Sequence, residues 1–246
     1  MIKFFSSWEK IALDKKLKSF ELCKSDGLPV LFLQDPKPAK FRILIAAGFH
    51  GNEPAGPVGL NKWAKNLPID NVAVSFLPLV NPTGFRDGTR DNWKKQPTNR
   101  GWIRAEEGET LSLEGRAIQK NLQKILDSSR DGFLTLHEDG SDAFYAYIYA
   151  KKKKKAFGQA ILSIGKKHFG LYSGYYEPDK VTIKNGLAES IVSSTFEDLI
   201  YDSGVPWVCV TETPIKIKEK QRSLAKRAEG TQDLITTFVN WVINKK

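Results

Sequence analysis

The chain has 246 residues, a hydrophobic content of 41% and a formal net charge of +10, so it can bury one large core or two small ones. Without any zinc-finger, RNP or P-loop pattern, or an eighteen-residue apolar run, neither nucleic acid nor a membrane is an expected partner. The N-terminus shows no secretory signal, and Cys23 and Cys209 lie in apolar segments as free buried thiols, so a cytoplasmic protein is expected.

The N-terminal part of the chain predicts short strands alternating with helices. The apolar run 41–47 predicts a buried strand that breaks at Gly48, and Pro54 suits the first turn of the helix that follows. Residues 84–110 form a long polar stretch rich in Arg and Trp, and a loop of that length is usually functional when it is ordered. The other expected elements here are a helix over 6–17, strands over 20–23, 30–33 and 72–80, a helix over 54–67 and a turn over 81–84.

The rest of the chain continues the alternation. Its pattern predicts helices over 111–128, 151–169, 188–201 and 223–243, strands over 133–136, 144–149 and 205–211, and a loop over 170–186. Alternating strands and helices favour a single α/β domain over residues 1–246, with a mixed, mostly parallel central sheet flanked by helices on both faces. In such sheets the ligand site lies beyond the carboxyl ends of the strands.

Three predicted strands end on polar residues that suit a site: His50 with Glu53, His137, and Glu212. An imidazole and a carboxylate, with one ligand from elsewhere in the chain, form the three-ligand set of a catalytic zinc site with a position left open for water. A lone His-x-x-Glu also recurs by chance in polar loops. The prediction of a zinc site therefore depends on His137 and Glu212 at the later strand ends. The remaining histidine, His168, ends a basic helix and is expected at the surface.

Taken together, these segments resemble the zinc metallocarboxypeptidases and their succinylglutamate desuccinylase and aspartoacylase relatives. The similar segments occur in the order of that family and span residues 43–214. They are His50-Gly-Asn-Glu53, Asn81-Pro-Thr-Gly84, Arg90, Asn99-Arg100, Leu134-Thr-Leu-His137-Glu and Val210-Thr-Glu212-Thr-Pro.

The resemblance implies a role for each matching residue. His50, Glu53 and His137 would hold one Zn²⁺ ion and leave a position for the attacking water. Glu212 would take a proton from that water and return it to the leaving amine. The oxyanion of the tetrahedral intermediate would be stabilised by Arg90, and the terminal carboxylate of the substrate would be bound by Asn99-Arg100.

Two departures from the family pattern concern the substrate site. The family has an acidic residue shortly before its Asn-Arg pair, whereas this chain has Gln96-Pro-Thr there. The peptidases also carry a mobile tyrosine about twenty residues before the catalytic glutamate, and residues 187–192 contain none. Tyr175, Tyr176 or Tyr201 could replace it, or Glu212 could move the proton alone.

The resemblance does not determine which kind of amide bond is hydrolysed. Only 34 residues follow Glu212, and they read as one helix, which favours a compact carboxypeptidase, similar in size to the murein peptide amidases, over a deacylase of N-acyl amino acids. A gap-free comparison with the peptidases, anchored on Gly204 and Glu212, also places Glu197 in the side-chain pocket, where it would receive a cationic terminal residue. Otherwise Glu197 is a solvent-facing helical charge. We therefore expect hydrolysis of small peptides, including cell-wall peptides with a basic end. The alternatives are an N-acyl amino acid deacylase and a non-catalytic binding protein.

Overall fold

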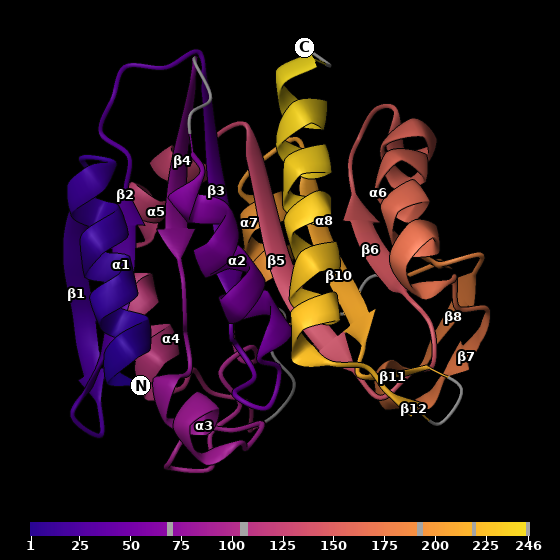
Figure 1. Cartoon of the computed structure of the whole chain (residues 1–246), viewed down its shortest axis with the longest axis horizontal. Helices are drawn as coiled ribbons and strands as arrows, with labels where there is room; N and C mark the ends of the chain where they lie inside the picture. The colour runs from indigo at the N-terminus through magenta and orange to yellow at the C-terminus, as the bar shows by residue number, and fades with distance from the viewer. Residues whose placement is uncertain (68–70, 104–107, 191–193, 218–219, 245–246) are drawn as a thin grey trace.

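The structure is a computed structural model that describes residues 1–67, 71–103, 108–190, 194–217 and 220–244 (Figure 1). A ten-stranded sheet runs through the whole molecule in the order β1-β2-β4-β3-β5-β10-β6-β9-β8-β7. Its strands are β1 (Lys18–Ser25), β2 (Leu28–Gln34), β3 (Phe41–Ala47), β4 (Val72–Leu77), β5 (Gly132–Asp139), β6 (Tyr145–Tyr149), β7 (Gly174–Tyr176), β8 (Val181–Lys184), β9 (Leu187–Ala188) and β10 (Val208–Pro214). A separate hairpin joins β11 (Lys216–Ile217) and β12 (Lys220–Gln221).

The centre of the sheet is parallel. Strands β4, β3, β5 and β10 pair in parallel, whereas β10 pairs with β6, and β1 with β2, in antiparallel fashion. Residues 43–47 of β3 are all buried, because helices cover both of its faces, and this explains the unbroken apolar run in the sequence. Both the mixed sheet and its strongly buried central strand are therefore confirmed.

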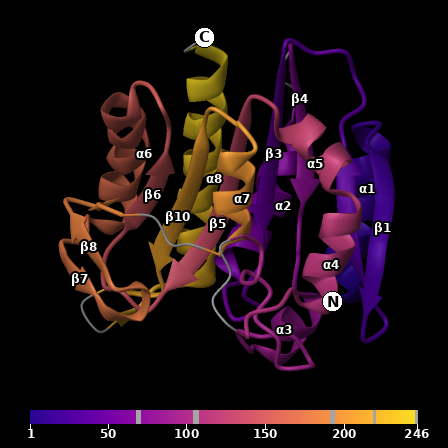
Figure 2. The ribbon, with the colours of Figure 1, turned by 180° about the vertical axis from the view of Figure 1, so that it is seen from behind.

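Helices cover the two faces of the sheet as separate layers (Figures 1 and 2). One layer contains α1 (Ile2–Asp14), α2 (Ala55–Lys65), α6 (Lys154–Phe169) and α8 (Leu224–Asn244), and the other contains α4 (Leu113–Lys120), α5 (Leu122–Ser129) and α7 (Phe196–Asp202). Successive residues of β3 point to opposite layers. Ile43 and Ile45 join the core under the first layer, and Leu44 and Ala46 join the core under the second.

Several predicted elements differ from the structure. The helix predicted over 6–17 is found as α1 at residues 2–14, and the turn predicted over 81–84 is the start of the helix α3 (Pro82–Asp87), which Asn81 caps. The helix over 111–128 is interrupted at Asn121, whose side-chain amide donates to the Ala117 carbonyl and competes with the helical backbone bonds. The loop over 170–186 contains strands β7 and β8. The predicted helix 188–201 is wrong in its first part, because Ala188 ends strand β9 and α7 begins only at Phe196; residues 191–193 lie outside the described residues.

The strands that carry the candidate site continue past the ends of their apolar runs. β5 extends to Asp139 and β10 to Pro214, so His137 and Glu212 lie inside paired strands rather than on loops after them. Of the two free cysteines, Cys209 is buried as predicted, but Cys23 is only partly buried. Among the described residues, no helix combines the length and the apolarity needed to cross a bilayer.

Candidate active site

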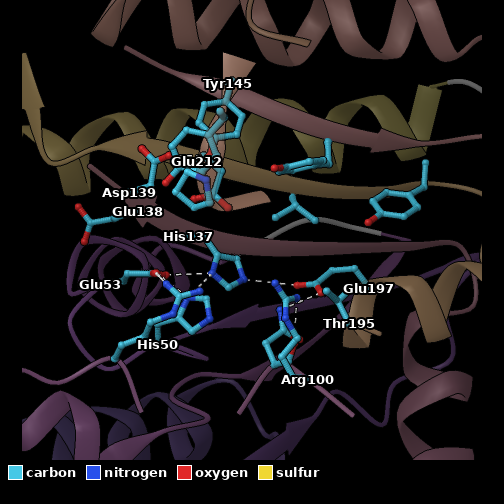
Figure 3. A pocket seen from close by; sticks show the side chains of 17 residues that line it. His50, Glu53, Arg100, His137, Glu138, Asp139, Tyr145, Thr195, Glu197 and Glu212 are labelled. Atoms are coloured by element: carbon cyan, nitrogen blue, oxygen red, sulfur yellow. Dashed lines mark hydrogen bonds and ion pairs between the residues drawn. The ribbon is translucent and has the colours of Figure 1, made fainter. Parts of the chain in front are cut away.

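The predicted site residues meet at the carboxyl ends of the parallel strands. His50 and Glu53 follow β3, His137 lies near the end of β5, and Glu212 lies near the end of β10. They line one cavity of about 470 Å³. Arg90, Asn99 and Arg100, from the loop between α3 (Pro82–Asp87) and α4, also line it. Figure 3 shows the side chains that line this cavity. The cavity thus lies at the edge of the sheet where ligands bind in α/β proteins.

Three of these side chains form a compact donor cluster. His50 Nδ1 lies 2.6 Å from Glu53 Oε1, and His137 Nδ1 lies 2.9 Å from Glu53 Oε2 and 3.3 Å from His50 Nδ1. One ligand atom from each residue falls within 4.8 Å of the other two. Two imidazole nitrogens and a carboxylate that converge in this way fit a divalent metal ion with an open coordination position.

Charge at the cluster also favours a cation. Burial alone would raise the pKa of Glu53, but His50 and His137 outweigh it and hold the pKa well below its usual value. Burial alone would lower the pKa of His137, but Glu53 and Glu197 outweigh it and raise the pKa well above its usual value. Burial does lower the pKa of His50. The carboxylates of Glu53 and Glu197 thus favour a positive charge at His137.

The turn that presents His50 and Glu53 is held against the segment Asn81-Pro-Thr-Gly84. Gly51 lies so close to Gly84 that a Cβ atom on Gly51 would be 1.9 Å from the carbonyl carbon of Gly84. The Asn81 side chain caps α3 by accepting from the Gly84 N–H at 2.8 Å, and its amide donates to the Arg90 carbonyl at 3.0 Å. The Gly51 N–H donates to the same Arg90 carbonyl. These contacts hold the metal-ligand turn and the backbone of Arg90 in fixed positions relative to each other.

The three polar residues of the long loop take different positions in the cavity. Arg90 Nη1 lies 3.6 Å from Glu53 Oε1, and the Arg90 side chain remains more than half exposed. Asn99 is buried, and its Oδ1 accepts from the Phe196 N–H at 3.0 Å. Arg100 follows it and also lines the cavity. The loop thus brings two guanidinium groups to the cavity, where each can meet negative charge on a substrate.

A buried carboxylate anchors this loop from behind. Glu114 on α4 accepts hydrogen bonds from the Ser25 hydroxyl at 2.5 Å and the Asn92 amide at 2.7 Å. The Asn92 Oδ1 in turn accepts from the backbone N–H groups of Lys94 and Gln96. No sequence pattern indicates this anchor, because its members are far apart in the chain. It holds residues 92–96 of the long polar loop in place.

The position of Glu212 is determined by the pairing of β10 with its two neighbouring strands. Glu212 pairs with His137 on the parallel strand β5 and with Tyr145 on the antiparallel strand β6, and it is half-buried at the cavity. The Tyr145 hydroxyl donates to Asp139 Oδ2 at 2.5 Å. Glu212 therefore lies beside the donor cluster on a paired backbone, so its position does not depend on a loop.

Three tyrosines that line the cavity were not predicted from the sequence. Tyr145, Tyr147 and Tyr149 alternate along β6 and all line the cavity. Their spacing of two within a predicted strand was the signal that places them on one face. Of the three tyrosines considered as replacements for the mobile tyrosine of the family, Tyr176 lines the cavity, whereas Tyr175 and Tyr201 are not among its lining residues.

Glu197 also reaches the cavity, but from a buried position. Its side chain is 1% exposed, so the interpretation as a solvent-facing helical charge is wrong. One oxygen lies 3.4 Å from His137 Nε2, and the other accepts from Asn99 Nδ2 at 3.0 Å. Burial would raise its pKa, but the hydrogen bond from His137 and its charge lower the pKa to about 2.

Glu138, next to His137, points away from the donor cluster and joins three elements. Its Oε2 accepts from the Ala55 N–H at the start of α2 at 2.6 Å, and its Oε1 pairs with Arg227 of α8. Both side chains of the ion pair are buried. Because Ala55 follows Glu53 by two residues, this carboxylate ties both metal-ligand segments to the C-terminal helix. His168, in contrast, pairs with Asp233 of α8 and takes no part in the cluster.

The sequence profile of the succinylglutamate desuccinylase/aspartoacylase catalytic domain matches residues 39–197, which is more than half of the chain. The match includes His50, Glu53 and His137. The chain belongs to this family. The resemblance inferred from the motifs is therefore confirmed, although the matched segment ends before Glu212. No curated protein sequence matched the chain.

Several solved structures are similar to this chain in fold. A protein from Shewanella amazonensis SB2B, named as a candidate metallopeptidase, is 31% identical with a TM-score of 0.88, covering 97% of this chain and 92% of its own. A similarly named protein from Shewanella denitrificans is 27% identical with a TM-score of 0.86 over 96% and 88% of the two chains. A metallo-carboxypeptidase from Burkholderia cenocepacia also shares the fold, with a TM-score of 0.71 and 16% identity. The match covers 98% of this chain and 68% of that protein. The fold is thus that of the metallocarboxypeptidases, as predicted.

Proposed function

We propose that this family member is a zinc-dependent carboxypeptidase that hydrolyses the C-terminal amide bond of a small peptide. The observation that carries the proposal is the register of Glu212 with His137 on adjacent parallel strands. It places a carboxylate beside the three-residue donor cluster in a cavity that two arginines also line. A general base, a set of metal ligands and cations for negative charge are the groups that amide hydrolysis requires.

His50, Glu53 and His137 would hold one Zn²⁺ ion, which suits a set of two imidazoles and one carboxylate. When bound, zinc supplies Lewis acidity and lowers the pKa of a coordinated water toward neutrality. The three ligands come from two different strand ends, and the contacts of Gly51, Gly84 and Glu138 fix both. Such fixed ligands favour catalysis, because little rearrangement is needed during the reaction.

The other residues of the cavity act on the substrate itself. Glu212 takes the proton of the attacking water and passes it to the nitrogen of the leaving amine. Arg90 stabilises the negative charge that develops on the carbonyl oxygen of the scissile bond. Arg100 binds the terminal carboxylate through its planar fork of N–H donors, and Asn99 lies beside it in a fixed orientation.

The main alternative is hydrolysis of an N-acyl amino acid by the same groups. The family profile supports this alternative, since it describes succinylglutamate desuccinylases and aspartoacylases. The full-length similarity to the Shewanella proteins named as candidate metallopeptidases supports peptide hydrolysis. A non-catalytic binding protein would need to have lost a donor or Glu212, and all of these residues are present at the cavity.

Two finer parts of the proposal concern the natural substrate. A basic terminal residue, including one from a cell-wall peptide, remains a prediction from the sequence, which had assigned Glu197 to the side-chain pocket. A cytoplasmic location remains a prediction from the sequence. Neither is required for the hydrolytic mechanism.

A substrate panel tests the proposal. Zinc-loaded protein should be assayed with peptides that have basic, acidic and apolar C-termini, with a γ-D-glutamyl-diaminopimelate amide, and with N-succinyl and N-acetyl amino acids. Release of a C-terminal residue supports the carboxypeptidase, and the relative rates for basic, acidic and apolar termini identify the preferred terminal residue. Hydrolysis of the N-acyl amino acids alone would favour the deacylase. No hydrolysis of any substrate by a zinc-loaded protein would support the binding protein.

A further inference from the structure

We propose that Glu197 is a positioning residue that holds the metal ligand His137 and the substrate-binding Asn99 in one hydrogen-bonded unit. The inference rests on the proposed function, because it assumes that His137 binds zinc. It differs from the role expected for Glu197 from the sequence, which was the recognition of a cationic substrate side chain.

The first observation is the position of the His137 ring between two carboxylates. Its Nδ1 faces Glu53 at 2.9 Å, and its Nε2 faces Glu197 at 3.4 Å, so opposite edges of the ring have separate partners (Figure 3). The His137 side chain is 3% exposed, which leaves little room for water to replace either partner. The ring orientation is therefore set by Glu53 and Glu197 together.

The second observation is the direction of the Glu197 contact. A neutral imidazole carries one proton, and a metal ion held by the cluster would take the lone pair of His137 Nδ1, which leaves that proton on Nε2. From Nε2 the proton can be donated to the Glu197 oxygen that lies 3.4 Å away. Nδ1 is the atom that faces the other two donors of the cluster. A carboxylate behind a ligating imidazole fixes its tautomer and makes it a stronger ligand.

The third observation is that the same carboxylate reaches the substrate side of the cavity. Its second oxygen accepts from Asn99 Nδ2 at 3.0 Å, and Asn99 Oδ1 accepts from the Phe196 N–H at 3.0 Å. Phe196 and Glu197 are neighbours at the start of α7, so Asn99 is held by two successive residues. One carboxylate thus sets the distance between a metal ligand and the segment that binds the terminal carboxylate.

Zinc affinity of the full chain tests this role without relying on activity. Competition against a chromophoric chelator should be measured for the wild type, Glu197→Gln and Glu197→Ala. Gln cannot accept from both His137 and Asn99, and Ala accepts from neither, so both variants should bind zinc about 10- to 100-fold more weakly. Asp202→Asn removes one negative charge from the same helix at an exposed position and should bind zinc like the wild type.

The outcomes separate this inference from the proposed function. If both Glu197 variants bind zinc within twofold of the wild type, the positioning role is refuted while the metal site stands. If the wild type itself binds no zinc, the proposed function fails and the inference fails with it. Turnover gives a second readout. A similar loss for basic and apolar terminal residues supports positioning, whereas a loss confined to basic substrates with unchanged zinc affinity refutes it.

Discussion

Gly51 and Gly84 are in direct backbone contact, although they are 33 positions apart in the chain. A Cβ atom on Gly51 would lie 1.9 Å from the Gly84 carbonyl carbon and 2.2 Å from the Phe85 nitrogen. Only glycine fits there, because no rotation of a side chain can relieve a clash between Cβ and a backbone. The contact joins the turn of His50 and Glu53 to the loop of Arg90, and so joins the metal ligands to the substrate-binding loop.

Replacing this glycine should damage the metal site and the fold together. Gly51→Ala forces the two backbones apart, so we expect a destabilisation of about 3 kcal/mol or more, at the upper end for overpacking. Urea unfolding measures this cost. Gly140→Ala is the matched control, since a Cβ there meets no atom within 4 Å, and its stability should stay within about 0.5 kcal/mol of the wild type. Equal stability of the two variants would contradict the contact.

The buried ion pair between Glu138 and Arg227 leads to a second prediction. Arg227→Met leaves the buried Glu138 without its charged partner, which should lower the free energy of unfolding by about 3–5 kcal/mol. Lys226→Met removes the same charge from an exposed neighbour on α8 and should change stability by less than about 0.5 kcal/mol. Thermal or urea unfolding distinguishes the two variants. A wild-type stability for Arg227→Met would show that the ion pair does not hold α8 to the site.

Zinc binding should stabilise the folded protein by mass action. At a free zinc concentration 100-fold above the Kd, we expect a gain of about 2.7 kcal/mol, which raises the Tm by about 5–10 °C for a chain of this size. A chelator should reverse the shift. His137→Ala should abolish it, whereas His168→Ala should keep it, because His168 pairs with Asp233 outside the cluster. A zinc shift that survives in His137→Ala would place the ion elsewhere.

Arg90 should affect the chemical step. We expect Arg90→Ala to lower kcat about 10²- to 10³-fold, as does removal of a donor to a developing oxyanion. Steady-state kinetics on a peptide substrate measures the effect. Arg86→Ala removes the same charge from α3, where Arg86 pairs with Asp26 and Asp87 at the surface, and should leave kcat unchanged. An equal loss in both variants would indicate a general effect of charge.

The sequence was sufficient for the parts of the site that depend on strand ends. The apolar runs before His50, His137 and Glu212 predicted three parallel strands, and the carboxyl ends of such strands meet at one edge. The same argument underlies the predicted sheet with helices on both faces. The carboxyl ends of β5 and β10 were predicted too early in the chain, because the polar ends of both strands are paired within the sheet and carry no apolar signal.

Contacts between distant segments could not be predicted from the sequence. The anchoring of Asn92 by Glu114, and the ion pair of Glu138 with Arg227, depend on how α4 and α8 pack on the sheet. Glu197 was expected to contact the substrate. Comparison with the peptidase sequences could not show that its carboxylate also contacts His137. Local periodicity describes one element at a time, whereas these contacts join separate elements.

The central claim is that Glu212 acts as the proton-transferring base of a zinc-dependent amide hydrolase. The most direct measurement is the turnover of zinc-loaded Glu212→Gln beside the zinc-loaded wild type, with bound zinc quantified in both samples. We predict equal zinc content and a loss of kcat of at least about 10²-fold, because an amide cannot accept the proton. Zinc-loaded Glu212→Gln with the turnover of the wild type would contradict the account.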